Sequence, residues 1–252
     1  MDEKYIIHFN TKIKATDRNR LTRANYCTPS DEVHYETKKT IKRARELREM
    51  NIERPLLIME YYWNIPNNIF KDEEHYADEW IEKHYKECME NFDLNMKFFD
   101  SLDEGIFHKK LSSFCKNNRF KEIFDLKEVS GEKGIYILVL DKYKQAYIGQ
   151  SLDVKKRILG HWRAKKEFDR LIYGQADTSV LSIDSFGALD TTRIFYKPVK
   201  WYKDVDDIER KFVAGMNPDY LLNRTAGGLN GETFSSIRNL ALFANMKKRK
   251  FK

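Results

Sequence analysis

The stretch 134–162, which reads GIYILVLDKYKQAYIGQSLDVKKRILGHW, constrains the fold of this 252-residue chain more than any other. An apolar, largely β-branched run is followed by a polar break at 141–145 and by a second, shorter apolar run that ends at Gly149. Two such runs around a polar break are typical of a β-hairpin. A short polar residue within Ser151-Leu152-Asp153 can then cap a helix. We therefore predict a strand–strand–helix unit here.

This unit carries four polar side chains that an apolar core does not require. Tyr136 lies on the first predicted strand and Tyr147 on the second. Arg157 and His161 are four residues apart on the helix, so they project from one face. The hairpin and the helix therefore place two tyrosines opposite an arginine and a histidine.

Two further elements follow the unit. The segment 191–199 is rich in β-branched and aromatic residues and predicts a third strand, with Pro198 at an edge or a strand end. Acidic residues begin a predicted helix over 204–215, where the helix dipole favours them. Glu209 lies on that helix, and Asn223 follows it at a helix-to-loop junction.

These residues, taken in order, resemble the GIY-YIG nuclease superfamily over residues 134–231. Both tripeptides are intact, and the Arg-x-x-x-His pair, the helical glutamate and the asparagine follow in sequence. The resemblance implies an α+β fold in which a small antiparallel three-stranded sheet is flanked by helices. It also implies a metal-dependent nuclease, in which Glu209 binds a single divalent ion, Mg²⁺ or Mn²⁺. The matching active-site positions are Tyr136, Tyr147, Arg157, Glu209 and Asn223, and His161 matches a histidine found in some branches, including certain restriction enzymes.

Each of these side chains can be given a role in phosphodiester hydrolysis. Arg157 would bind the phosphate, because a planar guanidinium matches two oxygens at once. Tyr136 would deprotonate or position the attacking water, which requires nearby positive charge to lower its pKa from about 10. Tyr147 would hydrogen-bond the phosphate, the water or Tyr136, and His161 would orient Tyr136 or move a proton. Asn223 would hold the backbone of the site.

Every one of these residues also has a simpler interpretation. The tyrosines could be core residues with a satisfied hydroxyl, and His161 a structural residue. Arg157 could be one more basic helix residue, and Asn223 an ordinary turn residue. Glu209 could be an exposed carboxylate that pairs with its neighbours on the helix.

The charge of the chain is unevenly distributed. The whole sequence has a net charge of +7, but residues 1–130 hold 23 Lys and Arg against 25 Asp and Glu, a net of −2. Residues 131–252 hold 23 against 14, a net of +9. A basic excess in the part that carries the motif favours a nucleic-acid partner, and duplex DNA is the partner that we expect.

The chain is predicted to have two domains, a mostly helical recognition or regulatory domain at 1–128 and a nuclease domain at 129–252 with a basic tail. In the first domain we expect a strand at 5–9, a basic loop or arm at 11–24, and helices at 28–50 and 72–101. A buried apolar segment at 55–63 and short helices within 104–126 complete it. In the second domain we expect a basic helix to continue to residue 173. The connection from 173 to 191 is then an insertion that touches DNA or a partner, and a helix follows at 234–246.

The three cysteines are far apart and no CxxC pair or histidine cluster joins them, which argues against a disulfide framework and a structural zinc site. No apolar run approaches the length of a membrane span, and the first residues lack the core of a signal peptide. We therefore expect a cytoplasmic protein with no membrane partner.

The sequence thus predicts a metal-dependent endonuclease of DNA. In the family that the chain resembles, homing enzymes usually carry the nuclease domain first, and so does the excision-repair nuclease. Here the nuclease domain comes second, so the resemblance fits a restriction-type or mobile-element enzyme better. Double-strand cleavage would need a homodimer or sequential nicking. Two alternatives remain open, a catalytically silent nucleic-acid-binding protein on the same scaffold and an RNA-cleaving nuclease.

Overall fold

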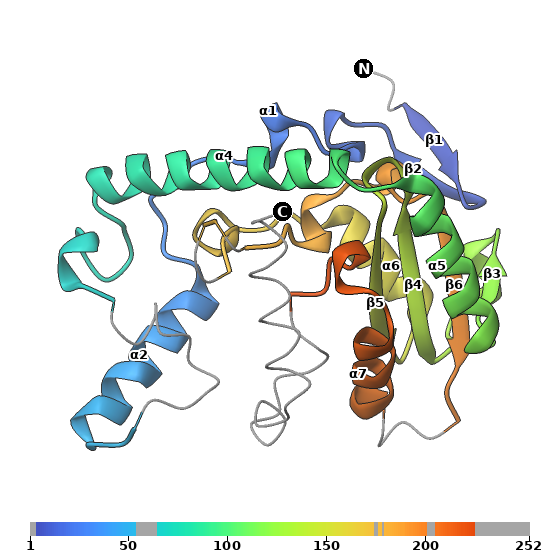
Figure 1. Ribbon diagram of the computed structural model, residues 1–252. Coiled ribbons are helices and arrows are strands. Elements are labelled where there is room, and N and C mark those ends of the chain that lie inside the picture. The colour runs from blue at the N-terminus through green and yellow to red at the C-terminus, as the bar shows by residue number, and fades with distance from the viewer. Residues whose placement is uncertain (1–3, 54–64, 174–175, 178, 201–204, 225–252) are drawn as a thin grey trace.

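The computed structural model describes residues 4–53, 65–173, 176–177, 179–200 and 205–224 (Figure 1). Over these residues the fold is α+β with two antiparallel sheets, one of two strands and one of four. The helices are α1 (Arg23–Tyr26), α2 (Tyr35–Glu49), α4 (Asp78–Asp100), α5 (Glu104–Asn117), α6 (Val154–Arg163) and α7 (Val205–Gly215). The strands are β1 (Tyr5–His8), β2 (Thr11–Lys14), β3 (Lys121–Ile123), β4 (Gly134–Leu140), β5 (Gln145–Ser151) and β6 (Arg193–Pro198).

The four-stranded sheet has the order β3-β6-β4-β5 and is antiparallel throughout. The predicted hairpin is confirmed as β4 and β5, with Lys144 in the left-handed region (φ 50°) at its turn. Tyr136 lies directly opposite Gly149, and Leu138 opposite Tyr147. Because cross-strand partners point to the same face of a sheet, both tyrosines lie on one face.

The prediction of three strands is wrong, because β3 is a fourth. We expected residues 121–123 to be helical, but α5 ends at Asn117 and Arg119 adopts a positive φ of 57°. After that turn, residues 121–123 pair with β6 as strand β3, and Ile123 is buried there. The boundary that we placed between residues 128 and 129 therefore separates two strands of one sheet. The functional division into two domains stays a prediction.

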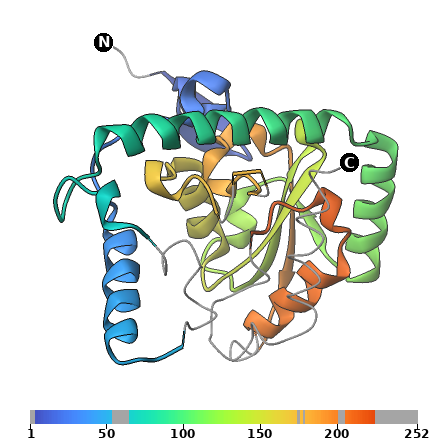
Figure 2. The same cartoon turned by 60° about the vertical axis from the view of Figure 1, so that its left-hand side comes forward.

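Helices cover both faces of this sheet. Figure 2 shows the sheet between α6 on one side and α5 with α7 on the other. The long helix α4 crosses the end of the sheet where β4 turns into β5, and Lys144 Nζ donates to the Phe99 carbonyl there at 2.8 Å. All seven residues of β4 are buried, so the sheet is the centre of the core.

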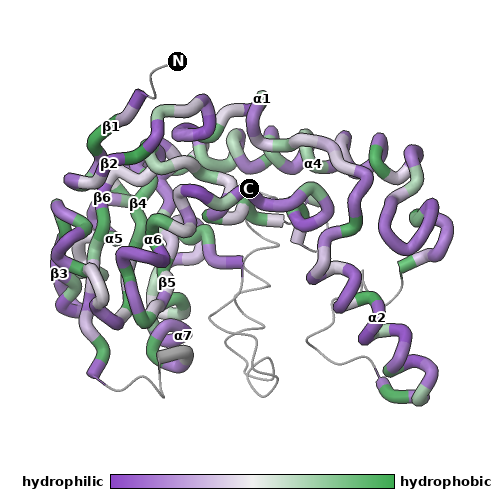
Figure 3. The backbone as a smooth tube through the Cα atoms, turned by 180° about the vertical axis from the view of Figure 1, so that it is seen from behind, coloured by the Kyte–Doolittle hydropathy of each residue, from purple (hydrophilic) through white to green (hydrophobic). Residues whose placement is uncertain are grey.

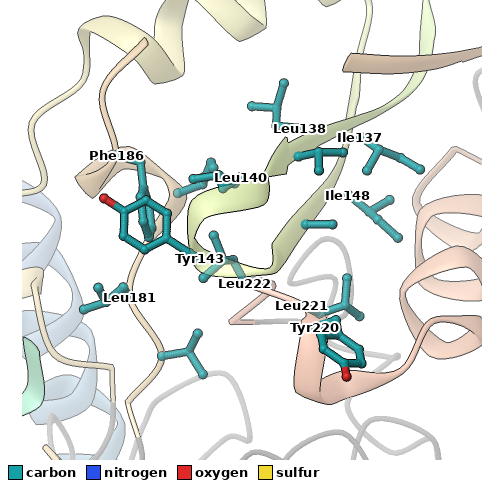
Figure 4. Close-up of a cluster of buried hydrophobic side chains, with 14 of the residues drawn as sticks. Ile137, Leu138, Leu140, Tyr143, Ile148, Leu181, Phe186, Tyr220, Leu221 and Leu222 are labelled. Carbon is teal, nitrogen blue, oxygen red and sulfur yellow. The ribbon is translucent and has the colours of Figure 1, made fainter. Parts of the chain in front are cut away.

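A cluster of buried hydrophobic side chains surrounds the β4–β5 hairpin (Figure 4). Ile137 and Ile148, which are cross-strand partners, lie on the face opposite Leu138. The hydropathy of the residues follows the same pattern, since β4 is largely apolar whereas α2 is largely polar (Figure 3). Burial of this apolar surface is the main force that holds the sheet against its helices.

We expected the basic segment 11–24 to be a loop or arm, and this prediction is wrong. Residues Thr11–Lys14 form β2, which pairs with β1 through a two-residue turn. Phe9 and Asn10 make that turn with φ of 44° and 52°, the positive values that a tight hairpin turn requires. The short helix α1 follows, and its capping residue Thr22 accepts from the Asn25 amide at 3.2 Å.

Two predicted helices begin later than expected, α2 at Tyr35 and α4 at Asp78. Both starts are delayed because the residues before them pair with one another in extended conformation. The Tyr76 amide donates to the Asp31 carbonyl at 2.7 Å, and the Val33 amide to the Glu74 carbonyl at 2.8 Å. The tertiary pairing therefore prevails over the local helix-start signal at Thr28 and Pro29.

The basic helix that we expected to continue to residue 173 ends at Arg163. Ala164 is extended (φ −62°, ψ 148°), and only a 3₁₀ turn at Phe168–Arg170 follows. The predicted helix 204–215 is confirmed as α7. The expectations for the apolar segment 55–63 and for the helix 234–246 with its basic tail fall outside the described residues.

Cys27, Cys88 and Cys115 are buried free thiols. Within the part of the chain that the structure describes, no helix combines the length and the apolar character needed to cross a lipid bilayer.

Candidate active site

The structure brings all six predicted site residues to the wall of one cavity of about 270 Å³. They come from β4, β5, α6 and α7 and from the segment that follows α7. The residues in question are Tyr136, Tyr147, Arg157, His161, Glu209 and Asn223. We call this space the catalytic cavity, after the role that we propose for it. It is also lined by six residues that the sequence did not single out, which are Gln150, Ser182, Ile183, Asp184, Leu222 and Arg224.

Tyr136 reaches the cavity because its cross-strand partner has no side chain. A Cβ atom at position 149 would lie 2.4 Å from the Tyr136 hydroxyl oxygen and 2.5 Å from the ring carbon that bears it. Such distances are far inside van der Waals contact, so the ring can lie over β5 only where residue 149 is glycine. Tyr147 is close by, with its ring centroid 6.3 Å from that of Tyr136.

His161 connects Tyr136 to a carboxylate. Its side chain is 3% exposed, and its Nε2 atom lies 2.8 Å from the Tyr136 hydroxyl oxygen. Its Nδ1 atom lies 2.6 Å from Oδ1 of Asp184. Because an ionised carboxylate can only accept, Nδ1 carries a hydrogen, and in the neutral ring Nε2 then accepts from the Tyr136 hydroxyl. The three residues form a continuous chain from phenol to imidazole to carboxylate.

Asp184 is the principal residue that sequence reasoning missed. It lies on a 3₁₀ turn, Ile183–Ser185, inside the connection that we interpreted as an insertion. Burial raises the pKa of Asp184. The hydrogen bond from His161 and the charges of Lys166 and Arg157 lower the pKa by more than burial raises it, so the net shift is downward. The carboxylate is therefore ionised at neutral pH. No spacing or motif marks a single loop aspartate, so the sequence carried no signal for it.

Arg157 faces the two tyrosines from α6, which begins with the Asp153 side chain accepting from the Lys156 amide at 3.0 Å. Burial alone lowers the pKa of Arg157, but the facing Tyr136 and Tyr147 raise it overall. The guanidinium therefore keeps its charge inside the cavity, where a low local dielectric strengthens its attraction for an anion.

The tyrosines do not behave as we expected from sequence. Burial raises the pKa of Tyr136 well above its ordinary value of 10.0, and the charge of Arg157 reduces this rise without reversing it. Burial, together with the charge of Glu209, also raises the pKa of Tyr147. Both phenols are therefore protonated at neutral pH and can donate hydrogen bonds. A protonated Tyr136 can act as a base only if a partner accepts its proton, and His161 lies within hydrogen-bond distance of the Tyr136 hydroxyl.

Glu209 is not the exposed carboxylate of the simpler interpretation. It is 7% exposed and lines the catalytic cavity from α7. Its neighbour Arg210 forms an ion pair with Asp207 instead. The position of Glu209 follows from the packing of α7 against β5 and β4, which turns one side of the helix toward the sheet.

The cavity fits a divalent ion held by one carboxylate. Among the residues that the structure describes, no group of three His, Cys, Asp or Glu side chains could hold a metal. A hard cation such as Mg²⁺ nevertheless binds through one or two carboxylates, with water and substrate phosphate completing its shell. Glu209 supplies such a carboxylate beside polar hydroxyl groups, so the donor set suits Mg²⁺ or Mn²⁺.

Asn223 fastens the segment after α7 to the edge of β5. Its Oδ1 atom accepts from the Ile148 amide at 3.0 Å, and its Nδ2 atom donates to the Ile148 carbonyl at 2.7 Å. The Leu222 amide donates to the Ala146 carbonyl at 2.9 Å. The side chain of Asn223 thus pairs with β5 as a neighbouring strand would, and it closes one wall of the cavity.

Arg224 is a second residue that the sequence did not indicate. Its side chain is half-buried, and its guanidinium donates to the Val180 carbonyl of the connection at 2.7 Å and to the Arg170 carbonyl, just before the connection, at 3.3 Å. Burial lowers its pKa from the ordinary value. Arg224 therefore holds the connection that carries Asp184 beside the sheet.

Comparisons of this chain with protein-family models, with curated protein sequences and with solved structures find no match. The functional argument therefore depends on the geometry and the chemistry of the catalytic cavity.

We predict that Asp184→Asn lowers the free energy of unfolding at pH 7. The pKa of Asp184 in the folded protein lies below its ordinary value of 3.8. Its contribution to stability is therefore present above that value and is lost as the pH falls through the folded-state pKa. Urea unfolding of the variant and the wild type should show a difference in midpoint at pH 7 that narrows below pH ~4.

The exposed Asp177→Asn is the matched control and should leave the midpoint unchanged at both pH values. A midpoint for Asp184→Asn that equals that of the wild type at pH 7 would contradict the assigned contact.

Proposed function

We propose that this protein is a metal-dependent endonuclease that hydrolyses phosphodiester bonds in DNA. The observation that carries the proposal is the convergence, in one cavity, of the Glu209 carboxylate, the Arg157 guanidinium and the chain Tyr136–His161–Asp184. Phosphodiester hydrolysis needs an activated water, stabilisation of charge on the phosphate and help for the leaving oxygen. The side chains of the cavity supply groups for the first two tasks: the chain from Tyr136 to Asp184 can activate the water, and Arg157 can stabilise charge on the phosphate.

The proton of the attacking water has a defined path. Tyr136 accepts that proton on its hydroxyl oxygen as it passes its own proton to Nε2 of His161, 2.8 Å away. Asp184 stabilises the resulting imidazolium through Nδ1. The water oxygen forms the new bond to phosphorus, the bond to the leaving oxygen breaks, and a solvent water protonates the alkoxide. Because the high pKa of Tyr136 disfavours a free phenolate, the two proton transfers occur together.

Arg157 and Glu209 serve the phosphate. The guanidinium binds the non-bridging oxygens and stabilises the charge that develops on them. A divalent ion held at Glu209 supplies further charge stabilisation at a phosphoryl oxygen when it is bound. Tyr147, with its hydroxyl protonated, donates to the phosphate or to the water.

The charge of the chain supports a nucleic-acid substrate, and we propose DNA. The net charge of +9 on residues 131–252 favours a polyanion, and a restriction-type or mobile-element enzyme is the proposed context. In a catalytically silent binding protein, the residues of the catalytic cavity would have only a structural role. In an RNA nuclease, the same residues would act on RNA. Both are outcomes of the experiment below.

We predict that the wild type nicks or linearises supercoiled plasmid with Mg²⁺ or Mn²⁺. Glu209→Gln should lower this rate by about 10²-fold or more, because the variant lacks the carboxylate that would hold the divalent ion and so lacks a preorganised positive charge at the reacting phosphate. The substitution keeps the shape of the side chain. Glu90→Gln, on the exposed side of α4, is the matched control and should cleave as the wild type does.

The remaining outcomes separate the alternatives. Duplex binding without cleavage by the wild type would favour the silent binding protein. Cleavage of RNA but not of plasmid would favour the RNA nuclease. Unchanged cleavage by Glu209→Gln would contradict the role of that carboxylate.

A double-mutant cycle tests the proton path. Tyr136→Phe and Asp184→Asn should each lower the single-turnover cleavage rate by about 10²-fold, the usual range for a general base. If the three residues act as one unit, the double variant should be little slower than either single variant. Fully multiplicative losses would contradict the path, because a merely structural role of Asp184 would add to the loss of the Tyr136 hydroxyl.

A further inference from the structure

A second cavity, of about 510 Å³, lies between the β1–β2 hairpin with its following turn and the end of α6. We call it the basic groove. Six cationic side chains line it, against two acidic ones. The cations are Lys12, Lys14, Arg18, Arg163, Lys165 and Lys166, and the acids are Asp17 and Asp184.

The basic groove and the catalytic cavity lie on two flanks of the same helix. Leu159 and Arg163 line the groove, whereas Arg157 and His161 line the catalytic cavity. Asp184 lines both, so the two spaces meet at the turn that carries it. The two spaces touch at this turn, and their positions on opposite sides of α6 differ by about one helix diameter, ~10 Å.

The wall formed by the β1–β2 hairpin is fixed against α6. His8 Nε2 lies 2.9 Å from the Thr191 carbonyl oxygen, and the His8 ring is 5.2 Å from that of Trp162. Across the groove, Arg18 donates to the Ala164 carbonyl at 3.4 Å. The early end of α6 at Arg163 turns Lys165 and Lys166 toward the same space. The N-terminal hairpin thus builds a rigid wall with cations on it.

The cations at the end of α6 are not neutralised by acids within the part of the chain that the structure describes, where Arg163, Lys165 and Lys166 form no ion pair. Lys166 is partly buried, and burial together with the charges of Arg224 and Arg170 lowers its pKa to about 8, although Asp184 and Asp169 act in the other direction. Cations crowded in this way gain stability when an anion joins them.

We propose that the basic groove binds the sugar-phosphate backbone of a DNA duplex beside the phosphate that is cleaved. This proposal rests on the function proposed above and assigns a substrate contact to the N-terminal hairpin. Phosphates follow one another by 3.4 Å of helix axis along one strand, so a separation of ~10 Å corresponds to about three nucleotides from the cleaved bond. A groove that contacts backbone alone adds affinity without sequence preference.

The test measures duplex binding by the inactive Glu209→Gln protein, so that cleavage does not interfere. Lys12, Lys165 and Lys166 are changed together to glutamine, and fluorescence anisotropy of a labelled duplex is followed over a range of salt concentrations. The slope of log K against log salt is negative, and loss of three phosphate contacts should reduce its magnitude by about 2.7. Binding should weaken by about tenfold or more at 0.1 M salt. Lys165→Glu alone, at an exposed position, should weaken binding in the same direction.

The matched control changes Lys109, Lys110 and Lys116 to glutamine, which removes the same charge from exposed positions of α5 that line neither cavity. This control should keep the affinity and the salt slope of the parent. If the groove variant behaves like the control while the wild type cleaves plasmid, the groove proposal is overturned and the proposed function stands. If the wild type neither cleaves plasmid nor binds the duplex, both proposals fall.

Discussion

The close approach of the Tyr136 ring to the backbone of Gly149 is the constraint on which the rest of the site depends. Strand pairing places the two residues directly opposite each other, and the missing side chain leaves room for the ring. The hydroxyl is thereby directed toward α6 rather than toward solvent. Without this arrangement the residues of α6 and α7 would surround a cavity that lacks its central hydroxyl.

The elements packed around the sheet supply the remaining residues of the site. Helix α6 packs on the tyrosine face and presents His161 to the hydroxyl, and the connection between α6 and β6 supplies Asp184 to His161. Arg224 and Asn223 tie that connection and the last described segment to the sheet. The end of α6 at Arg163 also brings basic residues beside the N-terminal hairpin. One short helix therefore organises both the candidate chemistry and the candidate contact with the polyanion.

The sequence predicted the parts of this structure that local patterns specify. The hairpin, the start of α6 and the helix α7 with Glu209 on it were predicted from periodicity and capping. The six site residues were predicted from the resemblance to the GIY-YIG nucleases. Patterns of that kind do not report tertiary pairing, which is why β3 and the late start of α2 were missed. Asp184 was missed because its contact with His161 spans a connection without periodic structure. The sign of the Tyr136 pKa shift depends on how much burial outweighs Arg157, and a sequence carries no measure of that balance.

The most direct test of the account is the cleavage rate of Gly149→Ala beside that of Gly160→Ala. A Cβ at position 149 would meet the Tyr136 hydroxyl at 2.4 Å, whereas a Cβ at position 160, on α6, meets nothing within 4 Å. If the approach of Tyr136 over β5 organises the active site, Gly149→Ala should fold and bind duplex DNA but cleave at least about tenfold more slowly than the wild type, since general-base catalysis is worth at least that much. Gly160→Ala should cleave at the wild-type rate. Equal cleavage by the two variants would contradict the account.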